Sequence, residues 1–490
     1  MRSSLMRPVL WSISYPLRLP AGISMVTSSS RGADVTGPPP RADWPSVPYV
    51  LGARWRDRRT PSVILGSLVV VGALAMPASA AGIFGPAGPV LPPASTTAST
   101  VPLPAYVAAA LEGPLSDDVL GPSVGAVVID VSTGEVVFDQ TGEQARSTAS
   151  NEKVFTAVSI LSALGPDHRI TTTVTWDPST SVLTLVGAGD PTLASVAAEG
   201  SSLDALASQV VGEVTDKETI TLRYDTSLFS GPALGPGWDS SYPKLGVAAP
   251  VSALIVNRAR VPGMDARNSD PALAAAGVFA QLLTQRGLAI DGPEPGTSVG
   301  SVIAETASIP LATMVETMLT ESDNDMSEQL AHLAGAQLTG TGTFESGGQA
   351  TKQALTSLGV PVSGLVSVDG SGLSYEDRAS PLTLASVIAT VAGDASPAWS
   401  WPIITGLPIA GLTGTLNDRF LDPDSASGAG VVRAKTGTLI GVSTLAGTVV
   451  DADGRLLAFA FMADEAVDVE LSRAALDRAA AALAECSCSG

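Results

Sequence analysis

Residues 431–462 read VVRAKTGTLIGVSTLAGTVVDADGRLLAFAFM, and this stretch decides the fold. Its apolar and β-branched runs at 431–436, 442–451 and 456–462 predict three strands. The Asp-Gly dipeptide at 453–454 is a strong hairpin signal, so the last two strands are expected to pair antiparallel.

A second hairpin is predicted much earlier in the chain. Residues 124–131 and 135–140 are typical of strands, and a Ser-Thr-Gly turn at 132–134 joins them. Helical patterns separate this hairpin from the C-terminal strands, and an alanine-rich helix at 469–485 follows them. This order predicts an α+β fold with one antiparallel sheet, built from both chain ends and flanked by helices.

The segment 167–300 has a different pattern, with short strands at 170–176, 182–186 and 219–224 between Gly, Pro and Asp clusters. We expect it to be a single inserted domain between the two parts of a larger domain, 105–166 and 301–490. Helices are predicted at 105–111, 151–164, 202–214, 271–288, 311–319, 326–338 and 350–358.

The composition is that of a globular protein and excludes one class of partner. The chain has 490 residues, 45% of them hydrophobic and 15% charged, and a formal net charge of −20. This charge excludes nucleic acid as a partner, because phosphate contacts need clustered Lys and Arg. Lysines are rare, which gives weight to any lysine in a motif; they are Lys153, Lys217, Lys244, Lys352 and Lys435.

The N-terminal part is typical of an exported protein. Residues 1–60 form a basic extension, and an uncharged apolar run within 61–80 ends in an Ala-x-Ala site. This pattern predicts a signal peptide or a membrane anchor, and export to the cell envelope. Residues 81–104 are rich in Pro, Ala, Ser and Thr and predict a linker. The length of the extension suggests a true start at Met25 or later.

Cysteine and histidine are too sparse for a metal site. Cys486 and Cys488 form a C-x-C pair, which can close a local disulfide outside the cytoplasm. His168 and His332 lie far apart in sequence and are expected to be structural or surface residues. A Ser-His-Asp mechanism would need a histidine beside the serine, and neither histidine lies in a motif.

A Ser-x-x-Lys motif occurs twice, at 150–153 and 241–244. Residues three apart on a helix are neighbours, so the chemistry requires the motif at a helix start. Only Ser150 and Lys153 open a helical pattern. The second copy lies among Pro243, Gly246 and Pro250, and we expect a loop there.

Two further motifs support a catalytic role for the first Ser-x-x-Lys copy. Ser322-Asp323-Asn324 lies between two helical stretches, and Lys435-Thr436-Gly437-Thr438 lies on a predicted strand. Each alone could be an ordinary surface turn or edge strand. Together, in this order, they match the motif set of penicillin-binding proteins and class A β-lactamases. A lysine base requires a lowered pKa, through burial or a neighbouring cation such as Lys435.

At these motifs the chain resembles the type-4 (class C) penicillin-binding proteins, the D-alanyl-D-alanine carboxypeptidase/endopeptidase family S13. The likeness covers roughly 105–485 and includes further segments. They are Gly187-Ala188-Gly189-Asp190-Pro191-Thr192-Leu193, Gly235-Pro236-Gly237-Trp238, 249–254 with Asn257, and Asp369-Gly370-Ser371-Gly372-Leu373-Ser374 with Ser380-Pro381.

The resemblance implies a penicillin-binding, serine β-lactamase-like transpeptidase fold and a role for each motif residue. Ser150 would be the acylated nucleophile, Lys153 its base, Ser322 the proton relay and Asn324 the group that holds the substrate amide. Lys435, Thr436 and Thr438, with Gly437 between them, would bind the substrate carboxylate. The backbone N–H groups of Ser150 and Thr438 would form the oxyanion hole.

The implied activity is a penicillin-sensitive serine D-Ala-D-Ala carboxypeptidase that acts on peptidoglycan stem peptides and is acylated by β-lactams. No metal or organic cofactor is implied. A β-lactamase and a non-catalytic peptidoglycan-binding envelope protein are the alternatives, and no Glu-x-x-x-Asn deacylation segment lies between Lys153 and Ser322. The balance with endopeptidase activity, the oligomeric state and recognition of substrate side chains stay open.

Overall fold

The computed structural model describes residues 104–488, apart from residue 198 and residues 215–218. The predicted extension 1–60, the signal or anchor segment 61–80 and the linker, up to residue 103, therefore lie outside the described residues. None of the helices within the described part is both long enough and apolar enough to cross a membrane.

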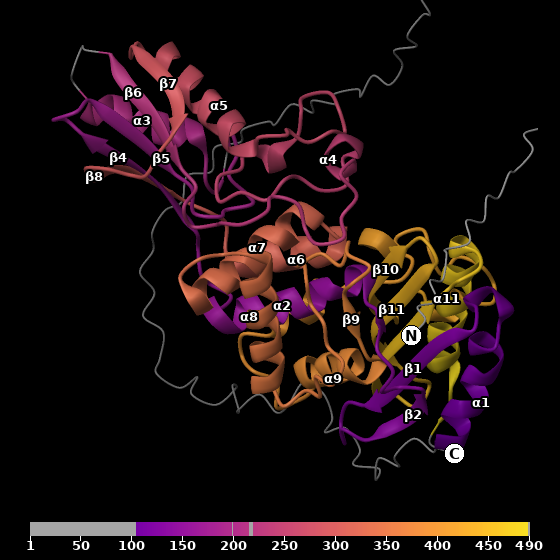
Figure 1. Cartoon of the computed structure of the whole chain (residues 1–490). Coiled ribbons are helices and arrows are strands. Elements are labelled where there is room, and N and C mark those ends of the chain that lie inside the picture. Colours follow the sequence, from indigo (N-terminus) through magenta and orange to yellow (C-terminus); the bar gives the residue numbers. More distant parts are fainter. Residues whose placement is uncertain (1–103, 198, 215–218, 489–490) are drawn as a thin grey trace, which may run out of the picture. The chain divides into compact units, whose positions relative to one another are not determined.

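Both ends of the described chain meet in one antiparallel sheet, the first sheet (Figure 1). Across the sheet the strands are β10 (Arg433–Leu439), β11 (Val442–Val450), β12 (Leu456–Asp464), β1 (Ser123–Asp130) and β2 (Val136–Gln140). At its centre β1 pairs with β12, with Val124 opposite Ala463 and Asp130 opposite Leu457. The prediction of one sheet built from both chain ends is confirmed.

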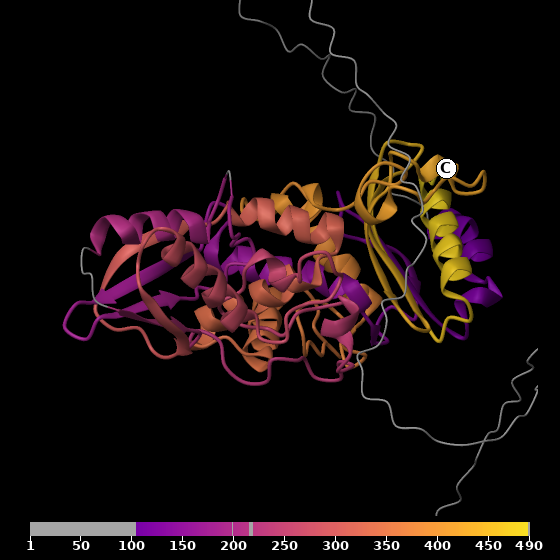
Figure 2. The ribbon, with the colours of Figure 1, turned by 90° about the horizontal axis from the view of Figure 1, so that it is seen from above.

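Helices cover both faces of the first sheet because its strands are apolar on both sides. Along β12, Phe459 and Phe461 pack into a core with α1 and α11, whereas Ala460 and Met462 face α2, α6 and α9. Figure 2 shows the yellow helix α11 on one side of the strands and orange helices on the other. The described helices before residue 167 and after residue 307 are α1 (Pro104–Leu115), α2 (Glu152–Leu164), α6 (Leu311–Glu321), α7 (Asn324–Thr339), α8 (Phe344–Ser357), α9 (Pro381–Ala392), α10 (Trp401–Thr405) and α11 (Val469–Glu485).

The segment that follows α2 forms a second sheet with its own hydrophobic core. Two helices, α3 (Leu203–Glu213) and α5 (Pro271–Gln285), pack on it, and β5-α3-β6 and β6-α5-β7 are parallel crossovers. Its strands, in spatial order, are β7 (Ile290–Pro295), β6 (Ile220–Asp225), β5 (Val182–Val186), β4 (Thr171–Asp177) and β8 (Ser301–Ala307).

The second sheet continues beyond residue 300. Strand β8 pairs antiparallel with β4, so the second sheet extends through Ala307. Neither β7 nor β8 was predicted from the sequence. Strand β7 contains Gly292, Pro293 and Pro295, which argue against a strand, and it is tolerated because it lies at an edge of the sheet.

Helix α9 was also missed, although its start is well marked. Ser380 is the N-cap and accepts a hydrogen bond from the backbone N–H of Thr383, and Pro381 occupies the first turn. The helix lies between the first sheet and other helices, and seven of its twelve residues are buried. A helix buried around most of its circumference has a weak amphipathic pattern, which explains the omission. A two-stranded ladder, β3 (Arg146–Ser147) with β9 (Arg378–Ala379), lies nearby.

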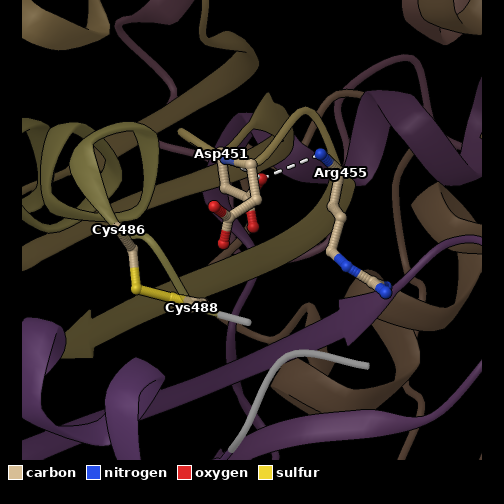
Figure 3. The surroundings of a disulfide bond; sticks show 5 residues. Asp451, Arg455, Cys486 and Cys488 are labelled. Carbon is tan, nitrogen blue, oxygen red and sulfur yellow. Dashed lines mark hydrogen bonds between the residues drawn. A yellow bond between two sulfur atoms is a disulfide. The ribbon is translucent and has the colours of Figure 1, made fainter. Parts of the chain in front are cut away.

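The C-terminal end is held against the hairpin between β11 and β12. Cys486 and Cys488 form a disulfide directly after α11, and Cys488 is buried in the core beneath the sheet (Figure 3). In the hairpin, the backbone N–H of Arg455 donates to Asp451 at 2.8 Å, and the Arg455 guanidinium pairs with buried Asp130. The disulfide that the C-x-C spacing allows is therefore present.

Candidate active site

The turn that carries Ser150 leads directly into helix α2. Ser150 lies in a 3-10 turn, Ala149–Asn151, and Lys153 follows in the first turn of the α-helix. Ala149 has a φ of 43°, which is uncommon for a residue with a side chain. This conformation aims the turn so that Lys153 Nζ lies 3.1 Å from Ser150 Oγ.

Two further groups hold the Lys153 side chain, which is completely buried. Its Nζ donates to the carbonyl oxygen of Ser371 at 2.6 Å and to Asn324 Oδ1 at 2.8 Å. With Ser150, these contacts match the three donors of an ammonium group. The lysine therefore has one defined position beside the serine.

Burial lowers the pKa of Lys153 to about 8, although Asp369 and Glu328 oppose this change. Of the two causes considered, burial and a neighbouring cation, burial is the principal one. The pKa of Lys435 is itself lowered well below its usual value, by burial first and then by the charge of Lys153. A larger neutral fraction at neutral pH is what a lysine base requires.

Near Lys153 lies a group of buried carboxyls that was not predicted from the motifs. Burial raises the pKa of Glu152 and of Glu328 to about 8 each, and raises the pKa of Asp377 well above its usual value. Glu328 accepts from the backbone N–H of Gly370. Glu152 and Glu328 therefore keep most of their protons at neutral pH.

The loop 369–374 places the carbonyl that binds Lys153. The carboxylate of Asp369 accepts from the backbone N–H groups of Ser371, Gly372 and Ser374, and from the indole of Trp238 at 2.7 Å. Four donors on one carboxylate fix the loop in a single conformation. The loop was predicted to be a family segment, but the spacing of its residues does not indicate that the Ser371 carbonyl contacts Lys153.

The second motif lies at the junction of α6 and α7. Ser322 adopts a left-handed conformation, with φ of 56° and ψ of 42°, and ends α6. Asp323 then caps α7 by accepting from the backbone N–H of Met326. Arg258, from the segment before α5, forms an ion pair with Asp323 at 2.5 Å.

The third motif reaches the second from strand β10. Lys435 Nζ donates to Ser322 Oγ and to the carbonyl oxygen of Thr436, at 2.8 Å each. The Thr436 hydroxyl lies 2.8 Å from that of Thr415. Ser150 and Lys153 are in contact, Lys435 binds Ser322, and Asn324 connects the second motif to Lys153.

Gly437 allows β10 to lie against the nucleophile turn. A Cβ atom at this position would come within 2.9 Å of the carbonyl oxygen of Thr148 and would also collide with the hydroxyl of Thr444. Thr444 in turn accepts from Asn151 Nδ2 at 2.7 Å. Only glycine allows this close approach of strand and turn.

The motif serines and threonines open into one pocket of about 750 Å³. Lys153 and Lys435 lie behind its wall, fully buried. The described lining residues are Ser150, Ser322, Thr415, Asp418, Arg419, Phe420, Leu421, Asp422, Thr436, Thr438, Glu470, Arg473, Ala474 and Asp477. The charged residues supplied by 418–422 and α11 were not predicted, because they belong to none of the three motifs.

The second Ser-x-x-Lys copy forms no comparable pair. Residues Tyr242–Leu245 make a one-turn helix, α4, rather than the loop that was predicted. Pro243 is compatible with this turn because it lies in the first turn, where no internal N–H bond is lost. Lys244 is exposed, and within the described part of the chain no hydrogen bond joins it to Ser241.

Neither histidine lies at the pocket. His332 is buried between the rings of Phe229 and Phe344, and burial lowers its pKa to about 4. Its Nδ1 lies 2.9 Å from the carbonyl oxygen of Glu328, one turn earlier on α7. His332 is therefore a neutral core residue.

The antiparallel sheet and its flanking helices define the class of protein, the penicillin-binding and serine β-lactamase-like fold. Among solved structures, penicillin-binding protein 4 from Haemophilus influenzae is similar in fold, with a TM-score of 0.63 and 22% identity. That similarity covers 76% of this chain and 97% of the other.

The particular family follows from the sequence comparisons. The model of the D-Ala-D-Ala carboxypeptidase 3 (S13) family matches residues 107–269 and 262–485. Carboxypeptidase DacB from Mycolicibacterium smegmatis is 34% identical over 460 residues, covering 89% of this chain and 99% of the relative. A carboxypeptidase from Mycobacterium tuberculosis is 32% identical, with 83% and 91% covered. The chain belongs to the S13 family.

Proposed function

We propose that the chain is a serine D-alanyl-D-alanine carboxypeptidase that acts on peptidoglycan stem peptides through an acyl-enzyme. Family membership supplies the reaction class. The observation that carries the proposal is the buried Lys153, whose Nζ lies 3.1 Å from Ser150 Oγ and whose pKa is lowered to about 8. A serine becomes a nucleophile only when a base of this kind is within hydrogen-bond reach.

In the first step, neutral Lys153 takes the proton of Ser150 while Oγ attacks the carbonyl carbon of the penultimate D-alanine. The backbone N–H groups of Ser150 and Thr438 stabilise the oxyanion, and such donors contribute about 3–4 kcal/mol each to catalysis. The hydrogen bonds from Lys153 to Asn324 and to the Ser371 carbonyl keep the base in place during the transfer.

In the second step, the peptide C–N bond breaks and the departing D-alanine needs a proton. Ser322 would relay it, since its Oγ lies 2.8 Å from the buried Lys435 Nζ and its side chain lines the pocket together with Ser150. Water then attacks the acyl-enzyme and regenerates Ser150.

The substrate would lie along β10. Thr436 and Thr438 line the pocket beside Ser150 and offer hydroxyls to the terminal carboxylate, while Gly437 lets the strand approach the serine closely. Asn324 Nδ2 donates to the carbonyl oxygen of Val247 at 2.9 Å, which leaves the second N–H of the amide for a substrate carbonyl.

A β-lactam presents its carbonyl to the same serine, so penicillin is expected to acylate Ser150. The β-lactamase alternative predicts fast penicillin turnover, and the non-catalytic alternative predicts no release of D-alanine. Family membership and the intact motif contacts favour the carboxypeptidase.

Peptidoglycan lies outside the cytoplasm, and the enzyme acts there. We propose that segment 61–80 directs export, either as a cleaved signal or as a retained anchor. We also propose that the second sheet, with its separate core, is the inserted domain, ending at Ala307 rather than at residue 300.

The test is D-alanine release from a pentapeptide that ends in D-Ala-D-Ala, by the purified chain and by Ser150→Ala. Release that disappears in the variant supports the proposal. A folded, penicillin-labelled protein that releases nothing would contradict it, and activity on cross-linked peptides would then identify an endopeptidase.

A further inference from the structure

Helix α11 brings a cationic side chain to the pocket that holds Ser150. Arg473 lies in its second turn and lines this pocket together with Thr436 and Thr438. It was not among the residues predicted from the motifs, because α11 lies beyond the last of them.

The Arg473 guanidinium contacts the third motif directly. Its Nε and Nη2 both donate to Thr438 Oγ1, at 3.3 Å each, and its Nη1 donates to Glu470 at 2.5 Å. The Thr438 contacts are long for hydrogen bonds, and the Glu470 side chain is 77% exposed. Neither partner holds the guanidinium strongly, since exposed ion pairs contribute only about 0–1 kcal/mol.

The other cations around the pocket are already bound by the protein. Arg419 forms a two-pronged pair with buried Asp477, at 2.6 and 3.0 Å. Lys153 and Lys435 are fully buried, and each is bound to motif residues. Among the described residues that line the pocket, Arg473 is thus the cation whose partners a ligand can replace.

We propose that Arg473 binds the free carboxylate that follows the scissile bond, together with the Thr438 hydroxyl, and so sets the preference for substrates with that charge. The inference rests on the proposed function. A carboxylate oxygen hydrogen-bonded to Thr438 Oγ1 lies within a few ångströms of a guanidinium that already touches that oxygen. The planar fork of arginine matches two carboxylate oxygens, which a lysine cannot do.

Glu470 binds Arg473 when no substrate is present. In the free enzyme its carboxylate occupies Nη1 of Arg473, and the substrate carboxylate replaces it. Because the pair is exposed, this exchange costs little free energy.

The test compares two peptides that differ only at their end, acyl-D-Ala-D-Ala and its C-terminal amide. Arg473→Ala is expected to lower kcat/KM for the acid about 10–100-fold, which is the range of one charge-assisted hydrogen bond. The kcat/KM for the amide should change by less than about twofold. Arg473→Lys should keep part of the preference, since it retains charge without the fork.

Arg478→Ala is the matched control. Arg478 lies on the same helix, pairs with Asp117 at 2.6 Å, and has a similarly exposed side chain, at 31% against 34% for Arg473. It does not line the pocket, so its loss should leave the acid-to-amide ratio unchanged.

An equal loss on both peptides, or no loss on the acid, would overturn the inference. If the wild-type chain releases neither D-alanine from the acid nor D-alaninamide from the amide, the proposed function fails instead. The variants are then compared in acylation by benzylpenicillin and by its methyl ester. A smaller preference for the acid in Arg473→Ala supports the carboxylate role, and an unchanged preference contradicts it.

Discussion

Residues 150–153 and 241–244 share the Ser-x-x-Lys spacing but lie in opposite surroundings. Lys153 is fully buried, and its Nζ lies 3.1 Å from Ser150 Oγ and 2.6 Å from the Ser371 carbonyl. Lys244 is exposed on a one-turn helix and has no hydrogen bond to Ser241 within the described residues.

The difference shows what the spacing leaves undetermined. A spacing of three residues on a helix brings a serine and a lysine to the same face, but it is burial that lowers the pKa of Lys153 toward neutral pH. For Lys153 the burial comes from segments far away in the chain, the loop 369–374 and the start of α7. The reactive unit is therefore the helix start together with those segments.

The largest effect is expected when Lys153 is removed, and Lys244 provides the matched control. Lys153→Met should lower kcat/KM for D-alanine release about 1,000-fold or more, because the general base is lost. Lys244→Met should change it less than about twofold, since Lys244 is an exposed side chain away from the pocket. Steady-state kinetics with one peptide measures both, and a comparable loss in Lys244→Met would show that the second copy takes part.

Removal of the proton relay should have a smaller effect. Ser322→Ala is expected to lower kcat/KM about 100-fold, because the hydroxyl that passes the proton to the leaving group is lost. The variant should still fold, because the Ser322 side chain is only half-buried. The matched control is Ser241→Ala, which should be neutral. Wild-type rates in Ser322→Ala would assign the relay to another group.

The pH profile should follow the lowered pKa of Lys153. Only neutral lysine accepts the serine proton, so the acylation rate should rise about tenfold per pH unit at low pH. The rate should level off at a pH of about 8, because burial lowers the pKa of Lys153 to about 8. Stopped-flow acylation by a chromogenic β-lactam measures this profile. A plateau that is already complete below pH 6 would contradict Lys153 as the base.

The last prediction concerns stability rather than catalysis. Burial raises the pKa of Glu328 to about 8, so the folded chain holds a proton that the unfolded chain releases near its ordinary value of 4.5. The stability from this proton is present below pH 4.5 and is lost as pH rises toward 8. Relative to wild type, the free energy of unfolding of Glu328→Gln should therefore rise by about 1.4 kcal/mol per pH unit across this window.

Urea unfolding at several pH values measures this difference, with Glu345→Gln, an exposed glutamate at the start of α8, as control. A constant difference between Glu328→Gln and wild type across the window would mean that Glu328 is ionised in the folded state.

The sequence predicted what depends on local pattern and on motif order. The strands around the Asp-Gly turn at 453–454 and the helix after Ser150 are confirmed, because turn chemistry and apolar periodicity specify them locally. The motif order correctly indicated the family. The structure brings the motif residues together as the resemblance implied, while their individual roles stay predictions.

The rest depends on contacts that no local pattern encodes. The Ser371 carbonyl reaches Lys153 because Asp369 shapes a loop, and a backbone carbonyl has no sequence signal. Strand β7 contains prolines that only an edge position tolerates, and edge positions are decided by the whole sheet. Arg473 lies on a helix predicted for its alanine-rich pattern, which does not indicate that it faces a pocket.

The most direct test of the central claim is to treat the purified chain with penicillin, digest it, and identify the acylated serine by mass spectrometry. The account predicts a single modified peptide that carries the adduct on Ser150, and no adduct in Lys153→Met at the same exposure. An adduct on Ser241, or equal labelling with and without Lys153, would contradict the assignment of the Ser150–Lys153 pair as the acylating unit.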